Sequence, residues 1–356
     1  MGAIGVLALI GALVHRGRAS QPALARALTA APERRPRRPP PVRPARIAAP
    51  LPGALLIADR GNDRMLLVDS HRRILWRFPT ARDRALGRTL QFDDDTFVEP
   101  GGTAIVSNEE EAHTILSVDI ATHRVRHLYG HPGVKGSAPG LLNTPDDAYV
   151  LPNGMLTVAD AYNCRILFIR GGRIVRRLGT TGVCRHDPPR SFGSVNGDTP
   201  LPDGGLLVSE IQGSWVDDLS RSGKLRWAVQ APVSYPSDPQ PLSGGRILLA
   251  DYATPGAAVI TNRQGRVLWR YGPKSGWGAL DHPSLATMLP NGEIAINDDY
   301  NDRVVIVDPR KDRIVWQYGH RGKAGTGPGF LNTPDGMDFV PLGRRGRPLW
   351  SLVHHP

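Results

Sequence analysis

The sequence predicts an all-β protein, a six-bladed β-propeller closed by a C-terminal inner strand that completes the N-terminal blade. Three observations predict this fold, and the first is that residues 319–335 repeat residues 130–146 without a gap. The second is an aliphatic and aromatic strand pattern that recurs six times, around residues 76, 127, 176, 227, 269 and 316. Successive copies lie 42 to 51 residues apart, and strand-rich repeats of about 40–50 residues are typical of propeller blades.

The third observation concerns the two ends of the repeat array. In the first blade, residues 54–69 form a hairpin and 74–78 an outer strand. No inner strand precedes this hairpin, although inner strands are expected at 96–99, 148–151, 199–201, 240–242 and 286–289 in the later blades. Residues 337–340 form an inner strand without a blade of its own, so we expect them to complete blade one, which leaves no free sheet edge. The apolar run 349–353 has no place in this scheme.

The charge distribution argues against a nucleic-acid partner. The net charge is +11, but residues 15–50 carry nine arginines and one glutamate, so most of the excess lies outside the blades. A short basic stretch of this kind is usually a solvated linker. The blade region itself is only mildly basic.

The N-terminal region is predicted to act in export. Residues 3–14 are uniformly apolar, but twelve residues are too few to cross a bilayer, which needs about 20. We therefore expect a signal peptide or short membrane anchor at 1–25, a disordered Pro- and Arg-rich linker at 26–52, the propeller at 53–341 and a tail at 342–356. The predicted product is a monomer outside the cytoplasm, secreted or associated with the membrane through its N-terminus.

A turn motif, Asp-x-x-Asn-x-Arg, occurs three times between apolar strands. Its copies are Asp59, Asn62 and Arg64; Asp160, Asn163 and Arg165; and Asp298, Asn301 and Arg303. We read Asn108, Glu111 and His113 as a degraded copy in blade two. Asp and Asn side chains stabilise turns by accepting backbone N–H groups. Because the motif recurs in several blades, we expect it to serve the fold rather than a site.

At these residues the chain resembles NHL-repeat six-bladed propellers, over about residues 53–341. Outer-strand tryptophans, and glycines that follow an aromatic residue, also give a weaker similarity to quinoprotein (PQQ-like) and arylsulfotransferase-type propeller repeats. PQQ itself is not expected, since the quinoproteins that this chain resembles have eight blades and adjacent cysteines.

Polar residues that differ between blades lie where the inner strands begin. Inner strands line the central channel of a propeller, so these residues should ring one of its mouths. The candidates for a ligand or cation site are Asp94, Asp95, Asp147, Asp198, Asp238, His282, Asp335 and Asp338. Two interpretations remain open: turn-capping carboxylates around a water-filled channel, or ligands of a Ca²⁺ ion, which takes several oxygen ligands.

His282 is the candidate catalytic residue, because it is the one imidazole at these positions. The resemblance to arylsulfotransferase-type propellers implies a nucleophilic channel histidine, and the resemblance to NHL-type amidating lyases implies histidines that hold zinc. A zinc site needs three or four protein ligands, so a catalytic zinc is disfavoured at this position. The alternative is a hydrogen-bonded structural histidine.

Cys164 and Cys184 are the two cysteines of the chain, and we predict that they form a disulfide. Cys164 lies in the turn of blade three and Cys184 in the connector to blade four, which should emerge on the same face. Disulfides persist in exported proteins, so the bond and the export prediction support each other. Ligation of a metal by the pair, with His186 nearby, is the alternative.

Three functions are compatible with this sequence. The first is an exported, non-catalytic propeller that binds a protein, peptide or polymer at the channel mouth. The second is a propeller enzyme, a lyase, lactonase-like hydrolase or sulfotransferase, with a cation at the central channel. The third is an envelope spacer. We favour the first, because no catalytic constellation is readable and a fold alone does not define a function.

Overall fold

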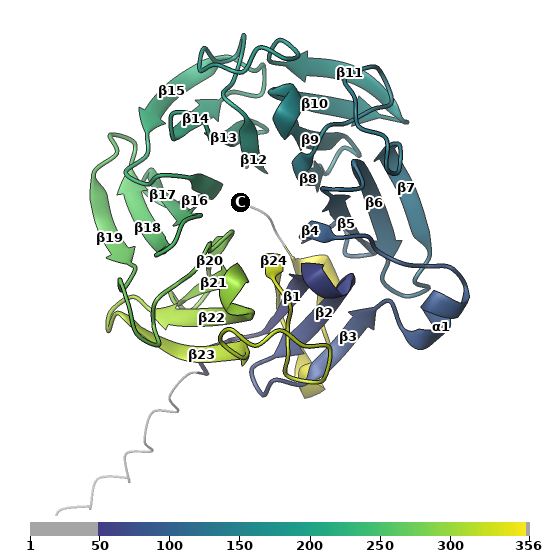
Figure 1. Cartoon of the computed structure of the whole chain (residues 1–356), viewed down its shortest axis with the longest axis vertical. Helices are drawn as coiled ribbons and strands as arrows, with labels where there is room; N and C mark the ends of the chain where they lie inside the picture. Colours follow the sequence, from purple (N-terminus) through teal and green to yellow (C-terminus); the bar gives the residue numbers. More distant parts are fainter. Residues whose placement is uncertain (1–48, 354–356) are drawn as a thin grey trace, which may run out of the picture. The chain divides into compact units, whose positions relative to one another are not determined.

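A computed structural model describes residues 49–353 of the chain. The predicted segment 1–25, most of the linker 26–52 and the last three residues of the tail lie outside the described residues. Six four-stranded antiparallel sheets are arranged around a common centre (Figure 1). The predicted six-bladed β-propeller is confirmed.

Blades one to three each run from an inner strand at the channel to an outer strand at the rim. In this order, blade one consists of β24 (Pro334–Val340), β1 (Ala54–Asp59), β2 (Arg64–Asp69) and β3 (Ile74–Phe78). Blade two consists of β4 (Asp93–Val98), β5 (Ala104–Glu109), β6 (Thr114–Asp119) and β7 (Val125–Gly130). Blade three consists of β8 (Pro145–Val150), β9 (Leu156–Asp160), β10 (Arg165–Arg170) and β11 (Arg173–Leu178).

Blades four to six follow the same order. Blade four consists of β12 (Val195–Pro200), β13 (Leu206–Glu210), β14 (Trp215–Leu219) and β15 (Leu225–Gln230). Blade five consists of β16 (Pro236–Leu242), β17 (Arg246–Asp251), β18 (Ala257–Asn262) and β19 (Val267–Tyr271). Blade six consists of β20 (Ala286–Met288), β21 (Ile294–Asp298), β22 (Arg303–Asp308) and β23 (Arg313–Gly319).

The ring is closed by β24, which pairs antiparallel with β1 from Ala54–Val340 to Asp59–Pro334. The C-terminal strand therefore completes the N-terminal blade, as the sequence predicts. Five inner strands begin earlier than predicted; β4, for example, begins at Asp93 rather than at residue 96. The sequence places the polar residues in the preceding turn. In the structure they form a β-bulge, and the first residue of the strand pairs again beyond this bulge, so the strand is longer than predicted.

The middle strands form the core. Every residue of β22 is buried, and four of the six are β-branched, which suits a pleated surface covered on both faces. Outer strands alternate instead, as in β11, where every second residue is exposed. Aliphatic side chains pack between neighbouring blades, so each sheet buries both faces against the next.

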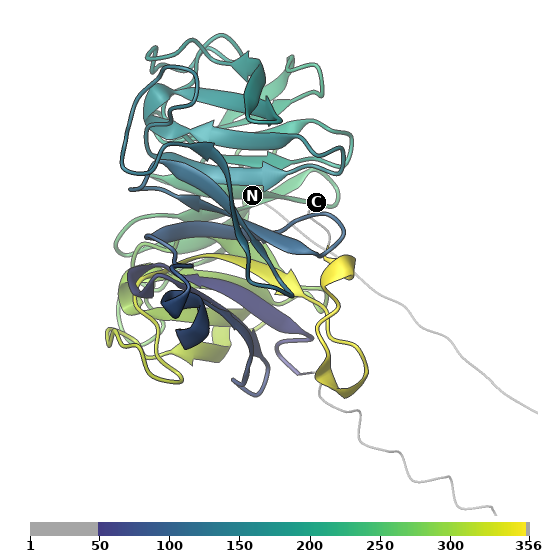
Figure 2. The ribbon, with the colours of Figure 1, turned by 90° about the vertical axis from the view of Figure 1, so that its right-hand side faces the viewer.

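The residues after β24 pack against blades one and two. Two 3-10 turns, η4 (Arg344–Gly346) and η5 (Trp350–Leu352), lie in this segment. The ring of Trp350 meets that of Trp76 edge to face at 5.9 Å between centroids. The apolar run 349–353 thus covers the core between these blades on the face away from α1, seen at the right of Figure 2.

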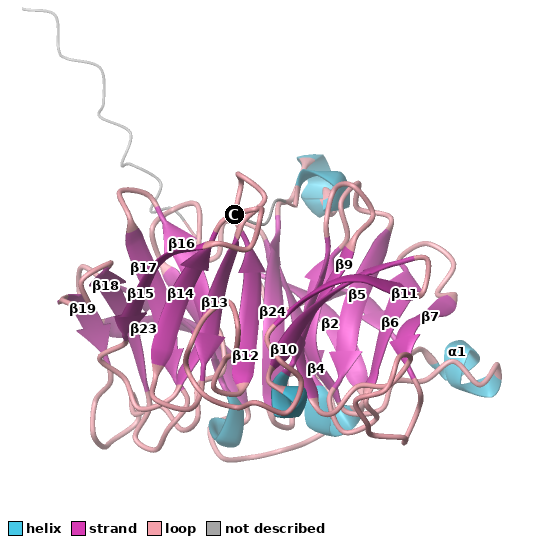
Figure 3. Ribbon diagram, turned by 90° about the horizontal axis from the view of Figure 1, so that it is seen from above, coloured by secondary structure: helices cyan, strands magenta, loops and turns pink. Residues whose placement is uncertain are grey.

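The two faces of the disc differ (Figure 3). The turns between the second and third strands lie on the channel-mouth face; those of blades one, three and six are 3-10 turns, η1 (Arg60–Asn62), η2 (Ala161–Asn163) and η3 (Asp299–Asn301). The connectors between blades lie there too, and the first contains α1 (Ala81–Ala85). Within residues 49–353, no helix is long and apolar enough to span a membrane.

Candidate functional site

The Asp-x-x-Asn-x-Arg motif anchors the connector that precedes its own blade. In blade six, Asp298 accepts hydrogen bonds from Arg303 Nε at 2.7 Å, from Asn301 Nδ2 at 2.9 Å and from the backbone N–H of Asp281 at 2.7 Å. Arg303 is fully buried and also donates to the carbonyl of Trp277. The motif carboxylate is therefore surrounded by donors.

Blades one and three repeat this geometry. Asp59 accepts from Arg64, Asn62 and the N–H of Asn332. Asp160 accepts from Arg165, Asn163 and the N–H of Asn143 in the same way. The two copies of the 17-residue segment are the connectors that these two motifs hold.

The residue before each third strand provides a second tie, to the following connector. It adopts a left-handed conformation in blades one, two, three, four and six. Its side chain bonds the next connector in each case, the pairs being Asp63 with Phe92, His113 with Thr144, Ser214 with Ser234, and Asp302 with Thr333. In blade three this residue is Cys164, whose disulfide with Cys184 is present, with 5.2 Å between the Cα atoms. The predicted disulfide thus joins blade three to its following connector at the position where other blades use a side-chain hydrogen bond.

The predicted alignment of the degraded motif in blade two is wrong by one residue. The strand register pairs Glu109 with Thr114, as it pairs Asp59 with Arg64, so Glu109 and not Asn108 occupies the motif position. Asn108 belongs to the channel instead. Its Nδ2 donates to the carbonyls of Pro145 and Asp146.

β-Bulges place polar side chains in two tiers along the channel. In blades one to five the inner strand carries one extra residue opposite the second strand, within its first five residues. The registers align the following six residues, which we call the mouth tier: Asp335, Asp94, Asp146, Asn196, Ser237 and Ser284. The next residues form the deep tier: Gly336, Asp95, Asp147, Gly197, Asp238 and Leu285. Bulges commonly re-aim side chains toward sites.

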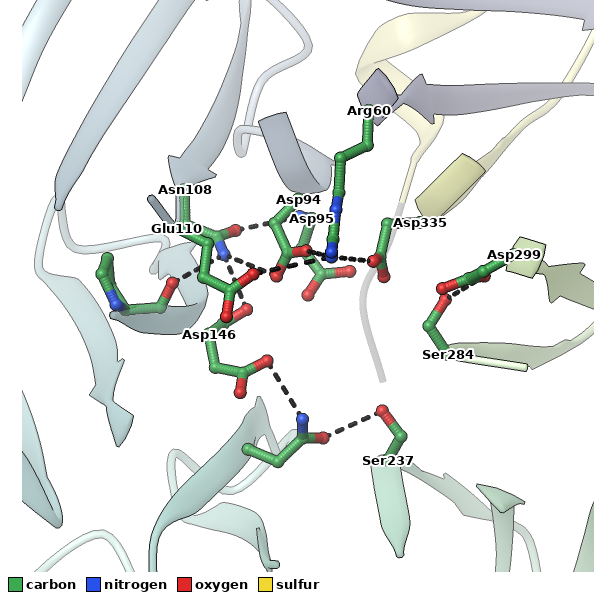
Figure 4. A network of polar contacts seen from close by, with 12 residues as sticks. Arg60, Asp94, Asp95, Asn108, Glu110, Asp146, Ser237, Ser284, Asp299 and Asp335 are labelled. Atoms are coloured by element: carbon green, nitrogen blue, oxygen red, sulfur yellow. Dashed lines mark hydrogen bonds and ion pairs between the residues drawn. The ribbon is translucent and has the colours of Figure 1, made fainter. Parts of the chain in front are cut away.

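Hydrogen bonds through Arg60 and Asn108 link five of the six mouth-tier residues in an open chain, and the sixth, Ser284, bonds separately to Asp299 (Figure 4). Arg60 Nη1 lies 2.5 Å from both Asp94 and Asp335, and 3.6 Å from Glu110. Asn196 extends the chain to Ser237, since it donates to Asp146 and accepts from Ser237. Although burial lowers the pKa of Arg60, Asp335 and Asp94 raise it above its ordinary value. This guanidinium is the one cation that forms ion pairs with the mouth tier among residues 49–353.

The deep tier has no such counter-charge within the described part of the chain. Asp95, Asp147 and Asp238 are buried, and one oxygen of each lacks a hydrogen-bond donor. Burial, followed by repulsion from Asp238 and Asp147, raises the pKa of Asp95 well above the usual range. Burial and repulsion from Asp147 and Asp146 do the same for the pKa of Asp238, and burial raises the pKa of Asp147 to about 7. Gly336 makes room for this tier, because a Cβ atom there would lie 2.3 Å from Asp95 Oδ1. Three buried carboxylates that repel one another thus share the deep tier, and a cation near them would lower this cost.

Two other predicted site residues lie farther along the inner strands. Asp338 accepts the backbone N–H of Val98 and so links blades one and two. Asp198 is buried one position beyond the deep tier and donates its N–H to Asp147. Asp338 thus supports the channel wall, whereas both carboxylate oxygens of Asp198 lack a donor among the described residues, and burial and Asp147 raise its pKa well above the usual range.

His282 lies on the mouth face, apart from the deep tier. Its Nδ1 is 2.7 Å from Asp281 Oδ1, and its ring lies beside those of Tyr252 and Tyr300, with centroids 4.9 and 4.4 Å away. The candidate catalytic residue therefore belongs to an aromatic group at the rim, whereas the deep-tier carboxylates are buried.

Sequence reasoning missed several mouth residues that share one position. Arg60, Glu110, Tyr252 and Asp299 each follow the first residue of the turn motif or its counterpart, Asp59, Glu109, Asp251 or Asp298. Alanine and isoleucine occupy this position in blades three and four. The sequence could have pointed to this position, because its residue type varies from blade to blade while the residue before it is always acidic.

A second hollow lies on the opposite face. It has a volume of about 600 Å³ and is lined by Leu151, Met155, Phe168, Leu201 and Val353, with other residues of blades two to four. Its walls are mostly apolar, and among the described residues that line it there is no cluster of carboxylates. The channel mouth is therefore the better candidate for charge-based recognition.

No protein-family model matches the chain, and no curated protein does. Among solved structures, the chain is similar to a protein of unknown function from Bacteroides caccae, with 20% identity over 75% of this chain and 93% of that chain and a TM-score of 0.52. It is also similar to a chain of the nidogen/laminin complex, with 12% identity, coverage of 80% and 97% and a TM-score of 0.55. A streptogramin B lyase structure shares 16% identity, with coverage of 84% and 90% and a TM-score of 0.51. At these identities the similarity shows the propeller fold alone.

Proposed function

We propose that this protein is an exported, non-catalytic NHL-like propeller whose channel mouth binds a ligand, polymer or partner protein, with Ca²⁺ held in the deep tier. The observation that carries the proposal is the set of three unpartnered carboxylate oxygens, on Asp95, Asp147 and Asp238. Ca²⁺ takes six to eight oxygen ligands from carboxylates, carbonyls and water. A buried carboxylate without a donor or counter-ion is unfavourable, and a bound cation removes that cost.

The mouth tier favours ligands that carry positive charge. Asp94, Asp146 and Asp335 face the opening, and Arg60 neutralises only part of their charge. Tyr252 and Tyr300 stand on the same face, where aromatic rings can stack on a cationic group. Basic peptide segments and amine-bearing polymers are the chemical classes that fit.

Export is supported by two features of the chain. The apolar stretch at 3–14 suits a leader or anchor, and the disulfide between Cys164 and Cys184 is of the kind that persists outside the cytoplasm.

An enzyme is the second candidate function, and one contact favours it. Asp281 orients His282 through a 2.7 Å hydrogen bond, as a carboxylate orients a histidine that transfers protons. In a lyase, lactonase-like hydrolase or sulfotransferase, His282 would act as acid, base or nucleophile beside a channel cation. His282→Asn should then abolish turnover and leave Ca²⁺ binding unchanged.

A thermal unfolding experiment tests the cation. We expect CaCl₂ to raise the melting temperature of the EDTA-treated full chain, because a ligand that binds the folded state stabilises it by mass action. Asp147→Asn and Asp238→Asn should reduce the rise, while Asp203→Asn, on the exposed surface, should not. A melting temperature that is the same in CaCl₂ and EDTA would refute Ca²⁺ in the deep tier.

A further inference from the structure

Blade four breaks the turn motif in a way that removes its positive charge. The register pairs Glu210 with Trp215, where blade one pairs Asp59 with Arg64. A glutamate thus replaces the motif aspartate, and a tryptophan replaces the arginine. Glu210 is fully buried, so its carboxylate needs another partner.

His186 takes the place of the missing guanidinium. It lies in the connector before blade four, and its Nδ1 is 2.9 Å from Glu210 Oε1. Its ring stacks on Trp215 at 3.9 Å between centroids and 5° between planes. The other oxygen of Glu210 accepts the N–H of Gly193. The disulfide at Cys184, two residues away, holds this connector against blade three.

A third polar residue, Asp217, has no counterpart in the other blades. It pairs with Val208 in the register, and the equivalent third-strand residues are Leu66, Leu116, Leu167, Val259 and Val305. All five are aliphatic and buried in the core between blades. The repeat therefore does not require a carboxylate at this position.

Asp217 is also unsatisfied. It is inaccessible to solvent, and neither of its oxygens has a hydrogen-bond donor among the described residues. Its partner Val208 belongs to the apolar cluster that packs blades three and four together. Burial, and the facing carboxylate of Glu210, raise the pKa of Asp217 to about 10. Two buried carboxylates side by side need either a shared proton or a cation between them.

We propose that His186, Glu210 and Asp217 form a binding site for a divalent transition-metal ion, with Zn²⁺ as the ion that best suits one imidazole and two carboxylates. One ligand atom from each residue lies within 4.8 Å of the others, so small side-chain movements bring all three to zinc-binding distance. Asp217 and Glu210 are fixed on adjacent strands, β14 and β13, and His186 is held by Trp215 and the disulfide.

Three protein ligands leave a coordination position open, which water or an external ligand can fill. His186 is partly exposed, with 23% of its side chain accessible, so solvent can reach the site from the mouth face. The site uses none of the deep-tier carboxylates and stands independently of the Ca²⁺ proposal.

Calorimetric titration of the EDTA-treated full chain with ZnCl₂ tests the site. We expect one Zn²⁺ per chain, and an affinity at least about 100-fold weaker in Asp217→Leu and in His186→Ala, since each removes a ligand. Asp217→Leu installs the residue type of the other blades, so it should fold and melt no lower than the wild type in EDTA. His123→Gln removes a histidine that also pairs with a carboxylate, Asp83, but outside the site, and should bind Zn²⁺ normally.

The outcomes separate the two metal sites. Failure of the wild type to bind Zn²⁺, or equal binding by wild type, Asp217→Leu and His186→Ala, would overturn the zinc site and identify the carboxyl pair as proton-sharing. The thermal response to CaCl₂ should persist in Asp217→Leu, so loss of the Ca²⁺ effect in the wild type bears only on the channel.

Discussion

Asp298 in the turn of blade six and Asp147 in the channel wall of blade three are both inaccessible to solvent, but their surroundings differ. Asp298 accepts hydrogen bonds from Arg303, Asn301 and a backbone N–H. Asp147 accepts one backbone N–H through Oδ2, while its Oδ1 has no donor among the described residues. The carboxylate in the turn therefore has hydrogen-bond donors on both oxygens, whereas the carboxylate in the channel wall has one oxygen that a ligand could bind.

The difference between these two carboxylates corresponds to how often their positions recur as carboxylates among the blades. Three blades share the turn motif in full, and its carboxylate serves the same purpose in each: it holds a connector against the blade. The deep tier places carboxylates in three of its six positions, and Asp217 occurs in one blade of six. The shared motif positions stabilise the fold, whereas the carboxylates of the deep tier and of Asp217 occupy positions that differ between blades and have oxygens without a donor among the described residues.

Breaking the turn should have the largest effect on stability. Arg303→Met removes a fully buried guanidinium and leaves Asp298 without its counter-ion. We expect the free energy of unfolding to fall by about 3–5 kcal/mol, as for other buried ion pairs that lose one partner. Urea denaturation followed by circular dichroism measures this loss.

Arg310→Met is the matched control, because Arg310 pairs with Asp308 while 73% of its side chain is exposed. Exposed pairs contribute at most about 1 kcal/mol. Equal losses in the two variants would contradict the view that the buried turn, rather than arginine pairing in general, holds the blades.

Removing the covalent tie should have the next largest effect. Replacing Cys164 and Cys184 with serine opens a loop closed over a sequence separation of 20 residues. We expect a loss of about 3 kcal/mol, from the entropy that the crosslink removes from the unfolded chain. Reduction of the wild type should reproduce the loss, and unreduced, denatured wild-type protein should titrate without reactive thiols. Two reactive thiols would show that the bond does not form.

Much of this comparison was predictable from the sequence. The repeat and its missing first inner strand predicted the ring and its closure, because blade spacing and strand patterns are local properties. The turn motif was visible for the same reason. The pairing of Cys164 with Cys184 followed from the face on which turns and connectors emerge.

The deep tier could be predicted only in part. Asp95, Asp147 and Asp238 are candidates on sequence grounds, but their arrangement depends on bulges in the inner strands, and a bulge is defined by pairing between strands rather than by composition. The misaligned turn motif of blade two has the same origin, because only the strand register shows that Glu109, and not Asn108, occupies the motif position. Asp217 was missed because a single carboxylate in a strand looks solvent-exposed until its neighbours are known.

Removing one carboxylate from the deep tier should have the smallest effect, and its sign should depend on calcium. The pKa of Asp147 is raised from 3.8 to about 7, so the folded state keeps a proton that the unfolded state releases between these pH values. In EDTA, the stability that this group contributes is fully present below about pH 4 and is lost as the pH rises to 7. Asp147→Asn carries no such charge, so we expect it to be more stable than the wild type at pH 8, by on the order of 1–2 kcal/mol. Its melting temperature should also fall less between pH 5 and 8.

In saturating CaCl₂ the order of stability should reverse, since the wild type gains binding energy that the variant loses. Asp203→Asn, whose carboxylate pairs with Arg226 at the surface, should show neither effect. If Asp147→Asn were less stable in EDTA as well, Asp147 would belong with Asp298, as a carboxylate that the fold itself satisfies.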